Sequence, residues 1–549
     1  MTLEEQIGQV LMVGFSGSTP SQEIIDLIQR FHIGNILLFS RNVRDAQQVL
    51  ELTQSLQAIA KDSGQPYPLL IAIDQENGIV QRLGEAVTIF PGNMALGAIG
   101  SEEVAYKVAL ATGRELKALG INMNLAPVVD VNNNPANPVI GVRSFGEDPQ
   151  QVARLGAAMV KGYRAAGVLS CLKHFPGHGD TEVDSHLALP TIPYTLERLE
   201  ALELVPFRRG IEAGAESVMI AHISFPALTR QAMSPATLSP AIVQGLLREQ
   251  LGFNSVILSD CLEMKAISET FGTERAAVMA LQAGIDLVLV SHHYTRQRGS
   301  IEAIQVAVQT HELSPQAVQQ AAGRVLRLKA QYLSWNELPG SEARAEASSP
   351  SLPCSTPAPT ACIGCEAHVQ LQRQAYELST TLVRNEDALL PLNLDSGQRI
   401  VVLSPQRNTM TMVEDRYYSD VMLEEIIKRY HTPVRVLSIA PGTMESACGE
   451  LSQTTSESDI FVIVTVNAHL DEGQAKLVGY LISSGRSVVG IAVRNPYDLL
   501  AFPQLRTYLV TYEYTRPALV AAVRVLFGER QAEGYLPVSL HPRVPPRND

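Results

Sequence analysis

Eight short apolar runs recur along roughly the first 330 residues, and they constrain the fold more than any other feature of this chain. Each run has the length of a buried strand, and segments with apolar residues at helical spacing, such as residues 45–52, separate the runs. Eight alternating β and α units predict an α/β fold with a (β/α)8 barrel, whereas an open doubly wound sheet more typically has roughly five to seven strands. The runs are Val10–Val13, Ile36–Phe39, Leu69–Ile73, Ile121–Leu125, Val168–Leu172, Ser217–Ile220, Ser255–Leu258 and Ile285–Val290.

Polar side chains follow most of these runs at the point where each predicted strand ends. Barrel enzymes keep their chemistry at the carboxyl ends of the strands, so this placement predicts an active site there. The residues concerned are Asp74, Gln75 and Glu76 after the third run, Asn122, Asn124 and then Arg143 in and after the fourth, Lys173 and His174 after the fifth, His222 after the sixth, and Ser259 and Asp260 after the seventh.

The most informative of these sites is the stretch that begins at Lys173 and continues to His186. An apolar strand gives way abruptly to a glycine- and proline-rich loop that carries three histidines, a lysine and three acids. A purely structural role explains the whole stretch poorly, although any single residue in it could be structural. We therefore expect this loop to carry chemistry.

Asp260 ends an apolar strand, where a carboxylate could act as a nucleophile, a base or a metal ligand, or could simply cap the following helix. As a nucleophile it would attack the anomeric carbon of a sugar and later be displaced by water. Most retaining glycosidases use a second carboxylic acid, but here the loop offers Asp184 and His186. A histidine paired with an aspartate can donate and accept protons near neutral pH; the alternative is an exposed turn.

Five charged residues at strand ends are candidates for binding sugar hydroxyl groups, although each could instead form a structural ion pair. A metal site among His174, His178 and His186 has little support because no H-x-x-x-H helix pattern is present. The hydroxyl-binding candidates are Asp74, Arg82, Arg143, Lys173 and His174.

A second, smaller α/β domain is expected after the barrel. We place the barrel at residues 1–338, a Pro/Ser/Ala-rich linker at 339–366 and the second domain at 367–549. Apolar runs predict a mostly parallel sheet, and no glycine-rich phosphate loop follows its first strand, so nucleotide binding is not expected. The predicted strands are Ile400–Leu403, Val434–Leu437, Ile460–Val464, Val488–Val493 and Tyr508–Thr511, with helices at Glu472–Ser483 and Pro517–Phe527.

Composition limits the partners and the compartment of the protein. With 549 residues, 46% hydrophobic and 18% charged, the chain is globular and too long for one core, and its net charge of -13 argues against nucleic acid or an anionic membrane surface as a partner. The N-terminus lacks the pattern of a signal peptide, and six cysteines in this length fit a reducing compartment, so a cytoplasmic location is expected.

Cys362 and Cys365 form a C-x-x-C with His368 nearby, and unpaired thiols are favoured there over a metal or redox site.

Several of these motifs together resemble glycoside hydrolase family 3, in its bacterial β-N-acetylglucosaminidase branch. The Lys173–Gly179 block with Asp184-Ser185-His186 is highly specific, whereas the Ser259-Asp260 pair alone would be weak. The resemblance covers roughly the first 330 residues and continues through Thr381–Asn385 and Leu389–Leu392 into the α/β sandwich domain of that family. The other matching segments are Ile73–Glu76, Gln81–Leu83 and Gly141–Gly146.

The resemblance implies a retaining glycosidase that removes terminal β-linked N-acetylglucosamine, with murein fragments as its substrate and no cofactor. It implies that Asp260 is the nucleophile and that His186, paired with Asp184, is the general acid/base. The five hydroxyl-binding candidates would hold the terminal sugar. Short members of the branch are active as a barrel alone, so the second domain is not expected to be catalytic. We expect a monomer or a weak homo-oligomer.

Two positions depart from the family pattern. The family usually has Gly-Gly-Arg after the glutamate, where this chain has Asn77, Gly78 and Ile79, and it often has an acid after the nucleophile, where this chain has Cys261. The first change could alter the loop, although Arg82 is retained. The second leaves the chemistry intact but changes the surroundings that tune the pKa of the nucleophile.

Three other functions compete with a hydrolase. A histidine acid/base does not repel phosphate as a carboxylate would, so a phosphorylase on the same scaffold remains open. A Schiff-base lyase would need a depressed pKa at Lys173 and leaves His174 and the Asp184–His186 loop without a task. An inactive sugar-binding protein is the third alternative, and the intact Asp260 and His186 argue against it.

Overall fold

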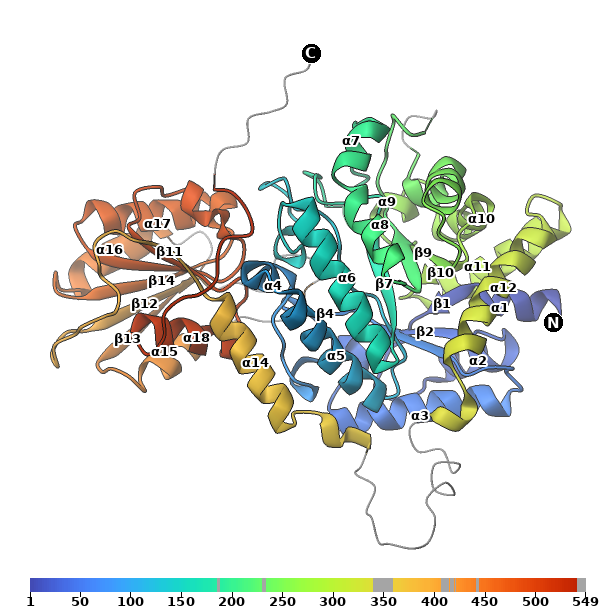
Figure 1. Ribbon diagram of the computed structural model, residues 1–549, viewed down its shortest axis with the longest axis horizontal. Helices are drawn as coiled ribbons and strands as arrows, with labels where there is room; N and C mark the ends of the chain where they lie inside the picture. Colours follow the sequence, from blue (N-terminus) through green and yellow to red (C-terminus); the bar gives the residue numbers. More distant parts are fainter. Residues whose placement is uncertain are drawn as a thin grey trace, which may run out of the picture.

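The computed structural model describes residues 1–184, 188–229, 234–338, 359–405, 414, 419, 421–440 and 444–540. Two units are present, a closed barrel and a second domain built on a separate sheet (Figure 1). Most of the predicted linker, residues 339–358, lies outside the described residues, as do residues 541–549. Among the described residues, no helix is both long and apolar enough to cross a membrane.

Eight parallel strands close the barrel in the order β1-β10-β9-β8-β7-β6-β3-β2, which confirms the predicted fold class. All eight apolar runs contribute one strand each. The strands are β1 (Leu11–Val13), β2 (Asn35–Leu38), β3 (Leu70–Ile73), β6 (Met123–Asn124), β7 (Leu169–Phe175), β8 (Ser217–Ile220), β9 (Val256–Cys261) and β10 (Leu287–Val290). A short hairpin, β4 (Gln75–Asn77) and β5 (Val80–Gln81), follows β3.

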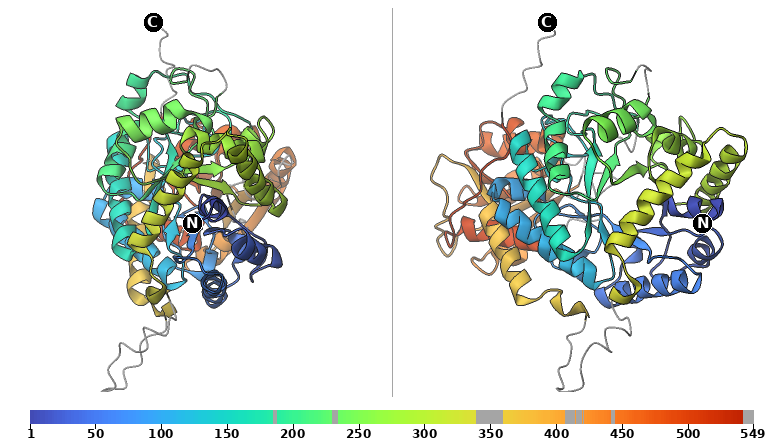
Figure 2. Two further views of the ribbon diagram at one scale, coloured as in Figure 1. Left: turned by 90° about the vertical axis from the view of Figure 1, so that its right-hand side faces the viewer. Right: turned by 45° about the vertical axis from the view of Figure 1, so that its right-hand side comes forward.

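Helices surround the barrel as an outer ring, which the right-hand view of Figure 2 shows around the strands. Alternation along each strand explains this packing, because Leu11 and Val13 face the helices while Met12 joins the apolar side chains inside the barrel. The helices are α1 (Leu3–Gln9), α2 (Gln22–Arg30), α3 (Ala46–Asp62), α4 (Asn93–Ile99), α5 (Glu102–Ala118), α6 (Pro149–Ala166), α7 (Leu196–Ala201), α8 (Leu204–Glu212), a π-helix η5 (Ala241–Gln250), α9 (Lys265–Ser268), α10 (Thr273–Ala283), α11 (Tyr294–Gln309) and α12 (Pro315–Tyr332). Short 3-10 turns are η1 (Ser40–Asn42), η2 (Gly84–Ala86), η3 (Gly141–Arg143), η4 (Ala236–Leu238) and η6 (Trp335–Glu337).

Two barrel strands bulge where they carry predicted site residues. Between Leu172 and Phe175 the register of β7 against β8 shifts by one residue, and a similar shift separates Leu258 from Cys261 in β9 against β10. A bulge inserts an extra residue and turns the neighbouring side chains, so it changes the direction of Lys173, His174 and Asp260 at the carboxyl end of the barrel.

The carboxy-terminal domain has a six-stranded sheet in the order β11-β16-β15-β14-β12-β13. All five predicted strands are present and parallel, and the antiparallel edge strand β11 was not predicted. The strands are β11 (Thr381–Asn385), β12 (Ile400–Pro405), β13 (Val434–Ile439), β14 (Ile460–Thr465), β15 (Ser487–Ala492) and β16 (Thr507–Val510). The helices and turns are η7 (Pro359–Cys362), α14 (Glu366–Ser379), α15 (Met422–Ile427), α16 (Met444–Thr454), η8 (Ala468–Leu470), α17 (Glu472–Ser483), η9 (Pro496–Leu500) and α18 (Arg516–Leu526).

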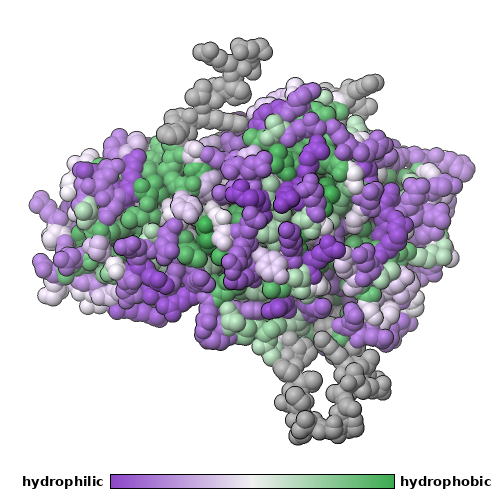
Figure 3. Space-filling model, viewed as in Figure 1, coloured by the Kyte–Doolittle hydropathy of each residue, from purple (hydrophilic) through white to green (hydrophobic). Residues whose placement is uncertain are grey.

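The carboxy-terminal domain lies against one side of the barrel, where its helix α14 packs against α4 (Figure 1). Buried apolar side chains from both units form one cluster at this contact, which we call the interdomain cluster. The barrel contributes Ile79, Val80, Met94, Ala95, Ala98, Val139, Ile140 and Val142, and the carboxy-terminal domain contributes residues that include Tyr497, Leu499, Phe502, Leu505 and Tyr508. Hydrophilic residues cover much of the outer surface in Figure 3, as expected when the apolar residues are used in such cores.

Candidate active site

A pocket of about 270 Å³ opens at the carboxyl ends of the barrel strands. Six of the eight predicted site residues line it, although they are spread over almost 190 positions of the sequence, from Asp74 to Asp260. Apolar side chains from inside the barrel, including Leu125, Met219 and Leu289, close its floor. The six residues are Asp74, Arg82, Arg143, Lys173, His174 and Asp260.

Lys173 is at the centre of a buried charge network. Its Nζ lies 2.7 Å from Asp74 Oδ1 and 2.7 Å from Glu76 Oε1. Burial lowers the pKa of Lys173, but the two carboxylates outweigh burial and the net shift is upward. The lysine is therefore charged at neutral pH and serves as a hydrogen-bond donor, which does not favour the Schiff-base alternative because that chemistry needs a free amine.

Glu76 connects Lys173 to Arg143. Arg143 Nε and Nη2 donate to the two oxygens of Glu76 at 2.8 Å each, a bidentate pair with almost no solvent exposure. Burial raises the pKa of Glu76, but Arg143 and Lys173 hold the net pKa far below its usual range. Glu76 is thus a permanent carboxylate that fixes two cations at the pocket wall.

The hairpin that carries Glu76 is positioned by an asparagine and two glycines. Asn124 bonds both backbone groups of Gln75, at 3.0 and 2.9 Å, so its amide extends the ladder between β3 and β6. Gly78 has φ +62° and approaches Gly92 so closely that a Cβ would lie 2.8 Å from the Gly92 Cα. Asn124 therefore holds the site together and does not itself line the pocket.

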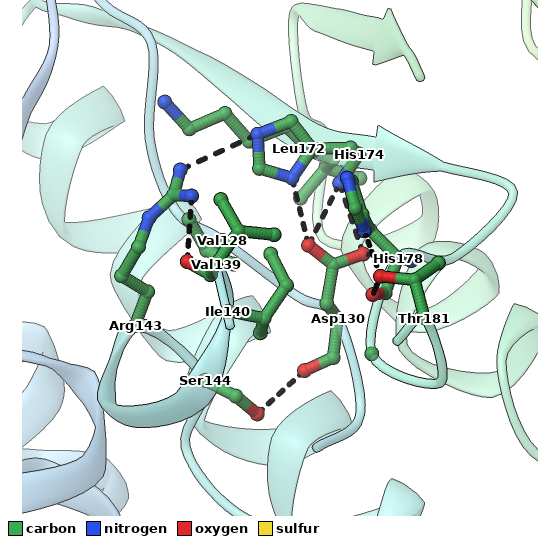
Figure 4. Close-up of polar contacts among 12 residues, drawn as sticks. Val128, Asp130, Val139, Ile140, Arg143, Ser144, Leu172, His174, His178 and Thr181 are labelled. Carbon is green, nitrogen blue, oxygen red and sulfur yellow. Dashed lines mark hydrogen bonds and ion pairs between the residues drawn. The ribbon is translucent and has the colours of Figure 1, made fainter. Parts of the chain in front are cut away.

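His174 is oriented by Asp130, which is completely buried. His174 Nδ1 lies 2.7 Å from Asp130 Oδ2, and the backbone N–H groups of His174 and His178 also donate to this carboxylate (Figure 4). Burial raises the pKa of Asp130, but the two histidines and these bonds lower it more. Since Nδ1 donates to a carboxylate, Nε2 is left as the acceptor that faces Arg143 Nη2 at 3.4 Å.

His178 completes this group at the wall of the pocket. Its Nδ1 lies 2.9 Å from Thr181 Oγ1, and its ring makes an edge contact with His174 at 5.7 Å between centroids. Burial lowers the pKa of His178 to about 4, and His174 adds to the shift. His178 is thus uncharged at neutral pH and acts as a packing and hydrogen-bonding partner of His174.

Asp260 lies in the bulge of β9 and accepts the backbone N–H of Cys261 at 2.7 Å. The carbonyl of Cys261 in turn lies 3.0 Å from His222 Nε2, while His222 Nδ1 faces Thr237 Oγ1 at 2.7 Å. His222 therefore fixes the peptide after Asp260 and is not among the residues that line the pocket. Burial raises the pKa of the Cys261 thiol to about 12, so this side chain brings no charge next to Asp260.

The predicted acid/base pair lies only partly within the described residues. Asp184 is buried and its carbonyl accepts the N–H of Ala188 at 3.1 Å, whereas Ser185, His186 and Leu187 lie outside the described residues. Asn137 connects the segment before Asp184 to the loop that carries Arg143, because its Nδ2 donates to the carbonyls of His178 and Gly179 at 2.9 and 3.0 Å.

Other residues of the site were not singled out from the sequence. Glu76 was noted in the sequence as a polar residue after the third run and as part of a matching segment, but it was not among the predicted site residues. The sequence did not point to Asp130, because it lies five residues after the end of the predicted strand and acts on His174 from beneath the pocket. At the mouth, Arg41 Cζ lies 4.2 Å from the centre of the Phe39 ring. His178 had been considered only as a possible metal ligand. The pocket residues that the sequence did not point to are Phe39, Ser40, Arg41, Met264, Ser291 and His292.

The departure from the family pattern at Ile79 and the histidine near the C-x-x-C both have structural roles. Ile79, at the position of the family's arginine, belongs to the interdomain cluster, so an apolar side chain suits the contact with the carboxy-terminal domain. His368 Nδ1 lies 2.6 Å from Glu115 Oε1 on α5, close to the Cys362–Cys365 turn. Among the described residues, His, Cys, Asp and Glu nowhere form a group of three or more that could hold a metal.

Comparisons with known proteins agree with this architecture. The family described as glycosyl hydrolase family 3 N terminal domain matches residues 2–328. A β-hexosaminidase A of Pseudoalteromonas piscicida is 34% identical over an alignment of 603 positions, which covers 98% of this chain and 97% of that protein. The solved structure of a glycoside hydrolase family 3 β-N-acetylglucosaminidase from Paenibacillus sp. str. FPU-7 is 39% identical with a TM-score of 0.88, covering 98% and 99% of the two chains.

A fungal multi-domain β-N-acetylglucosaminidase of the same family is 42% identical with a TM-score of 0.90. The match covers 98% of this chain but only 61% of the fungal chain, which is therefore much longer. The matched family region contains all eight barrel strands and every residue of the pocket described above. This chain belongs to glycosyl hydrolase family 3 and is a glycoside hydrolase.

Proposed function

We propose that the protein is a retaining β-N-acetylglucosaminidase that removes terminal N-acetylglucosamine through a covalent intermediate on Asp260. The observation that carries this proposal is the pocket itself, where Asp260 lies together with Asp74, Arg143, Lys173 and His174. Charged donors and acceptors suit the hydroxyl groups of one sugar, and the apolar floor limits the depth of the pocket. A single-sugar pocket favours cleavage at a chain end.

Asp260 is suited to the role of nucleophile. Its Oδ1 accepts the Cys261 N–H, which orients the carboxylate, and the carboxylate would attack the anomeric carbon. As the carbon–oxygen bond to Asp260 forms, the bond to the departing group breaks and that oxygen takes a proton. In the second step, water gives up a proton and attacks the same carbon, which releases the sugar and restores the Asp260 carboxylate.

The Asp184–His186 pair is proposed as the proton donor and acceptor in these two steps. The other carboxylates of the pocket support this choice, because Glu76 is bound to Arg143 and Lys173, and Asp74 to Lys173. A carboxylate whose pKa is far below its usual range, as for Glu76, cannot protonate a leaving group near pH 7. A histidine held by an aspartate can perform both proton transfers.

Murein fragments are the proposed physiological substrate, in a cytoplasmic compartment. The activities named for the relatives support N-acetylglucosamine as the sugar that is removed. The polar mouth of the pocket, formed by Arg41, Arg82 and His292, suits an acidic group beyond the scissile bond. The five cysteines of the described residues are free thiols, as in a reducing compartment.

Product analysis on 4-nitrophenyl N-acetyl-β-glucosaminide, with and without phosphate, tests the reaction. We expect free N-acetylglucosamine in both cases. N-acetylglucosamine 1-phosphate formed in proportion to added phosphate would instead identify a phosphorylase, and no turnover would support a binding protein or another sugar.

A second experiment tests the roles of the residues. A 5-fluoro glycosyl fluoride of N-acetylglucosamine should label the peptide that contains Asp260, and Asp260→Ala should abolish both labelling and turnover while the fold is retained. His186→Ala should slow hydrolysis of an alkyl glycoside far more than that of a 4-nitrophenyl glycoside, whose leaving group needs no proton. A near wild-type rate in Asp260→Ala would contradict the nucleophile assignment.

A further inference from the structure

The carboxy-terminal domain packs directly behind the loop that supplies Arg143 to the pocket. We call residues 129–147 the Arg143 segment. Its inner side carries the Arg143 guanidinium toward Glu76 and His174, as Figure 4 shows for Arg143 and His174. Its outer side contributes Val139, Ile140 and Val142 to the interdomain cluster. The same short segment therefore forms the sugar-binding wall on one side and a domain contact on the other.

Two side chains of the carboxy-terminal domain bond this segment directly. Tyr497, on η9, accepts a hydrogen bond from Asn132 Nδ2 at 3.0 Å, and both residues are buried. His469, on η8, lies 3.0 Å through Nε2 from the carbonyl of Pro135 and 3.0 Å through Nδ1 from Asp498. The rings of His469 and Tyr497 are in edge contact at 5.6 Å, so the two groups act as one unit.

Close backbone packing supports these bonds. Gly141 has φ +44°, and a Cβ at this position would lie 2.6 Å from Asn495 Oδ1. At the end of the segment, the backbone N–H of Glu147 donates to the carbonyl of Pro537 at 3.1 Å. Contacts from the carboxy-terminal domain are thus distributed along the segment from residue 132 to residue 147.

A second connection reaches Arg143 through α4. Glu513 Oε1 accepts the backbone N–H of Gly92 at 3.0 Å, at the start of α4. The next residue, Asn93, donates from Nδ2 to the carbonyl of Arg143 at 2.7 Å. The Arg143 backbone is therefore held by a residue whose own position depends on the carboxy-terminal domain.

We propose that the carboxy-terminal domain sets the affinity of the pocket for the terminal sugar by holding the Arg143 segment, with Tyr497 as the principal positioning residue. Tyr497 does not touch the pocket, and its influence passes through Asn132 to Arg143. The proposal rests on the proposed function in taking Arg143 as a sugar ligand. Since Arg143 would bind the sugar in the ground state and the transition state alike, loosening the segment weakens binding more than it slows the chemical step.

The test compares full-length wild type with Tyr497→Phe, which removes one oxygen atom. We expect KM for the 4-nitrophenyl glycoside and Ki for N-acetylglucosamine to rise together by about three- to tenfold, the effect of one lost buried hydrogen bond, with kcat within about twofold. Tyr430→Phe is the matched control, because its hydroxyl bonds Glu529 within the carboxy-terminal domain and its ring stacks on Phe527. The control should keep wild-type KM and Ki.

Hydrogen–deuterium exchange gives a readout that does not depend on turnover. Peptides covering residues 131–147 should exchange faster in Tyr497→Phe and in His469→Ala, while peptides from β1 and β2 should not change. A lower melting temperature with unchanged KM, Ki and exchange would mean that the contact only stabilises the fold, and would overturn the proposal. If wild type fails to cleave the glycoside, the proposed function fails, and the exchange comparison still decides whether the segment is held in this way.

Discussion

Asp130 determines which nitrogen of His174 carries a proton, and it does so from beneath the pocket. Three N–H groups converge on its carboxylate, two from the backbone and one from the His174 ring. An amide at this position has only one acceptor oxygen, so Asp130→Asn leaves at least one of these donors without a partner and frees the ring to change tautomer. We expect kcat/KM to fall by about 10- to 100-fold, measured by steady-state kinetics on the 4-nitrophenyl glycoside.

Asp148→Asn is the control for this substitution, because Asp148 caps α6 at the surface and asparagine can keep that bond. Circular dichroism should show that both variants retain the fold. Wild-type kcat/KM in Asp130→Asn would show that the tautomer of His174 does not matter for sugar binding.

The buried carboxyl group of Glu203, at the start of α8, should make the stability of the protein depend on pH. Burial raises its pKa from 4.5 to about 7, while Arg198 lowers it. A carboxyl group whose pKa is raised on folding favours the folded state at low pH, and this contribution is lost as the pH rises from about 4.5 to about 7. Glu203→Gln imitates the protonated form and should therefore be more stable than wild type at pH 8 by about 3 kcal/mol.

Urea unfolding at pH 5 and pH 8 measures this effect. The difference between wild type and Glu203→Gln should be small at pH 5 and large at pH 8. Equal pH dependence in the two proteins would show that Glu203 does not titrate in this range.

At the scale of elements, the loop after β7 and the Arg143 segment pack backbone against backbone at Gly179, beside the side-chain bonds made by Asn137 and Asp130. A Cβ on Gly179 would fall on the carbonyl oxygen of Val131 and lie 2.5 Å from its carbon. Gly179→Ala should push the two loops apart, destabilise the protein by about 1 to 3 kcal/mol and reduce kcat, because the segment leading to Asp184 moves. Thermal unfolding and kinetics on the same samples test this prediction.

Gly245→Ala is the matched control, because Gly245 lies in the helical η5 and a Cβ there meets nothing within 4 Å. Alanine at that position should be neutral or stabilise by up to about 1 kcal/mol. A fully active Gly179→Ala of normal stability would show that the two loops can move apart without consequence.

At the scale of the whole molecule, the interdomain cluster couples the two units. Ile79→Arg restores the family's arginine but places a charge among apolar side chains, and should destabilise the contact by about 2 to 4 kcal/mol. Calorimetry should then resolve separate transitions of the two units where wild type shows one. Ile79→Val, which removes only one methylene, should cost about 1 kcal/mol and keep a single transition. A single transition at the wild-type temperature in Ile79→Arg would mean that the contact at Ile79 does not couple the two units.

The sequence predicted the elements well because each one depends on local pattern. All eight barrel strands and five strands of the second sheet follow from runs of Val, Ile and Leu, and α17 has the predicted bounds. The edge strand β11 was missed because Thr381–Asn385 is only five residues long, contains just two apolar residues and pairs antiparallel to β16. The exact domain boundaries stay a prediction, and the 339–358 part of the linker lies outside the described residues.

In the candidate site too, local pattern predicted some residues, whereas the roles of others depend on tertiary contacts. Polar residues at strand ends identified Asp74, Lys173, His174 and Asp260, because the carboxyl ends of parallel strands meet on one face of a barrel. The roles of Asp130, Glu76 and Asn137 depend on contacts between segments up to 67 positions apart, and no local pattern shows them. The role of the Asp184–His186 pair stays a prediction.

By itself, the sequence determined the barrel, the carboxyl-end face where the candidate site lies and the residue types available there. Each strand and helix follows from a hydrophobic pattern over a short stretch of the chain. Only the tertiary structure decided which charges neutralise one another, which nitrogen of His174 is free, and that a second domain lies behind Arg143. These outcomes depend on distances of a few ångströms between distant segments, and such distances exist only once the chain has packed.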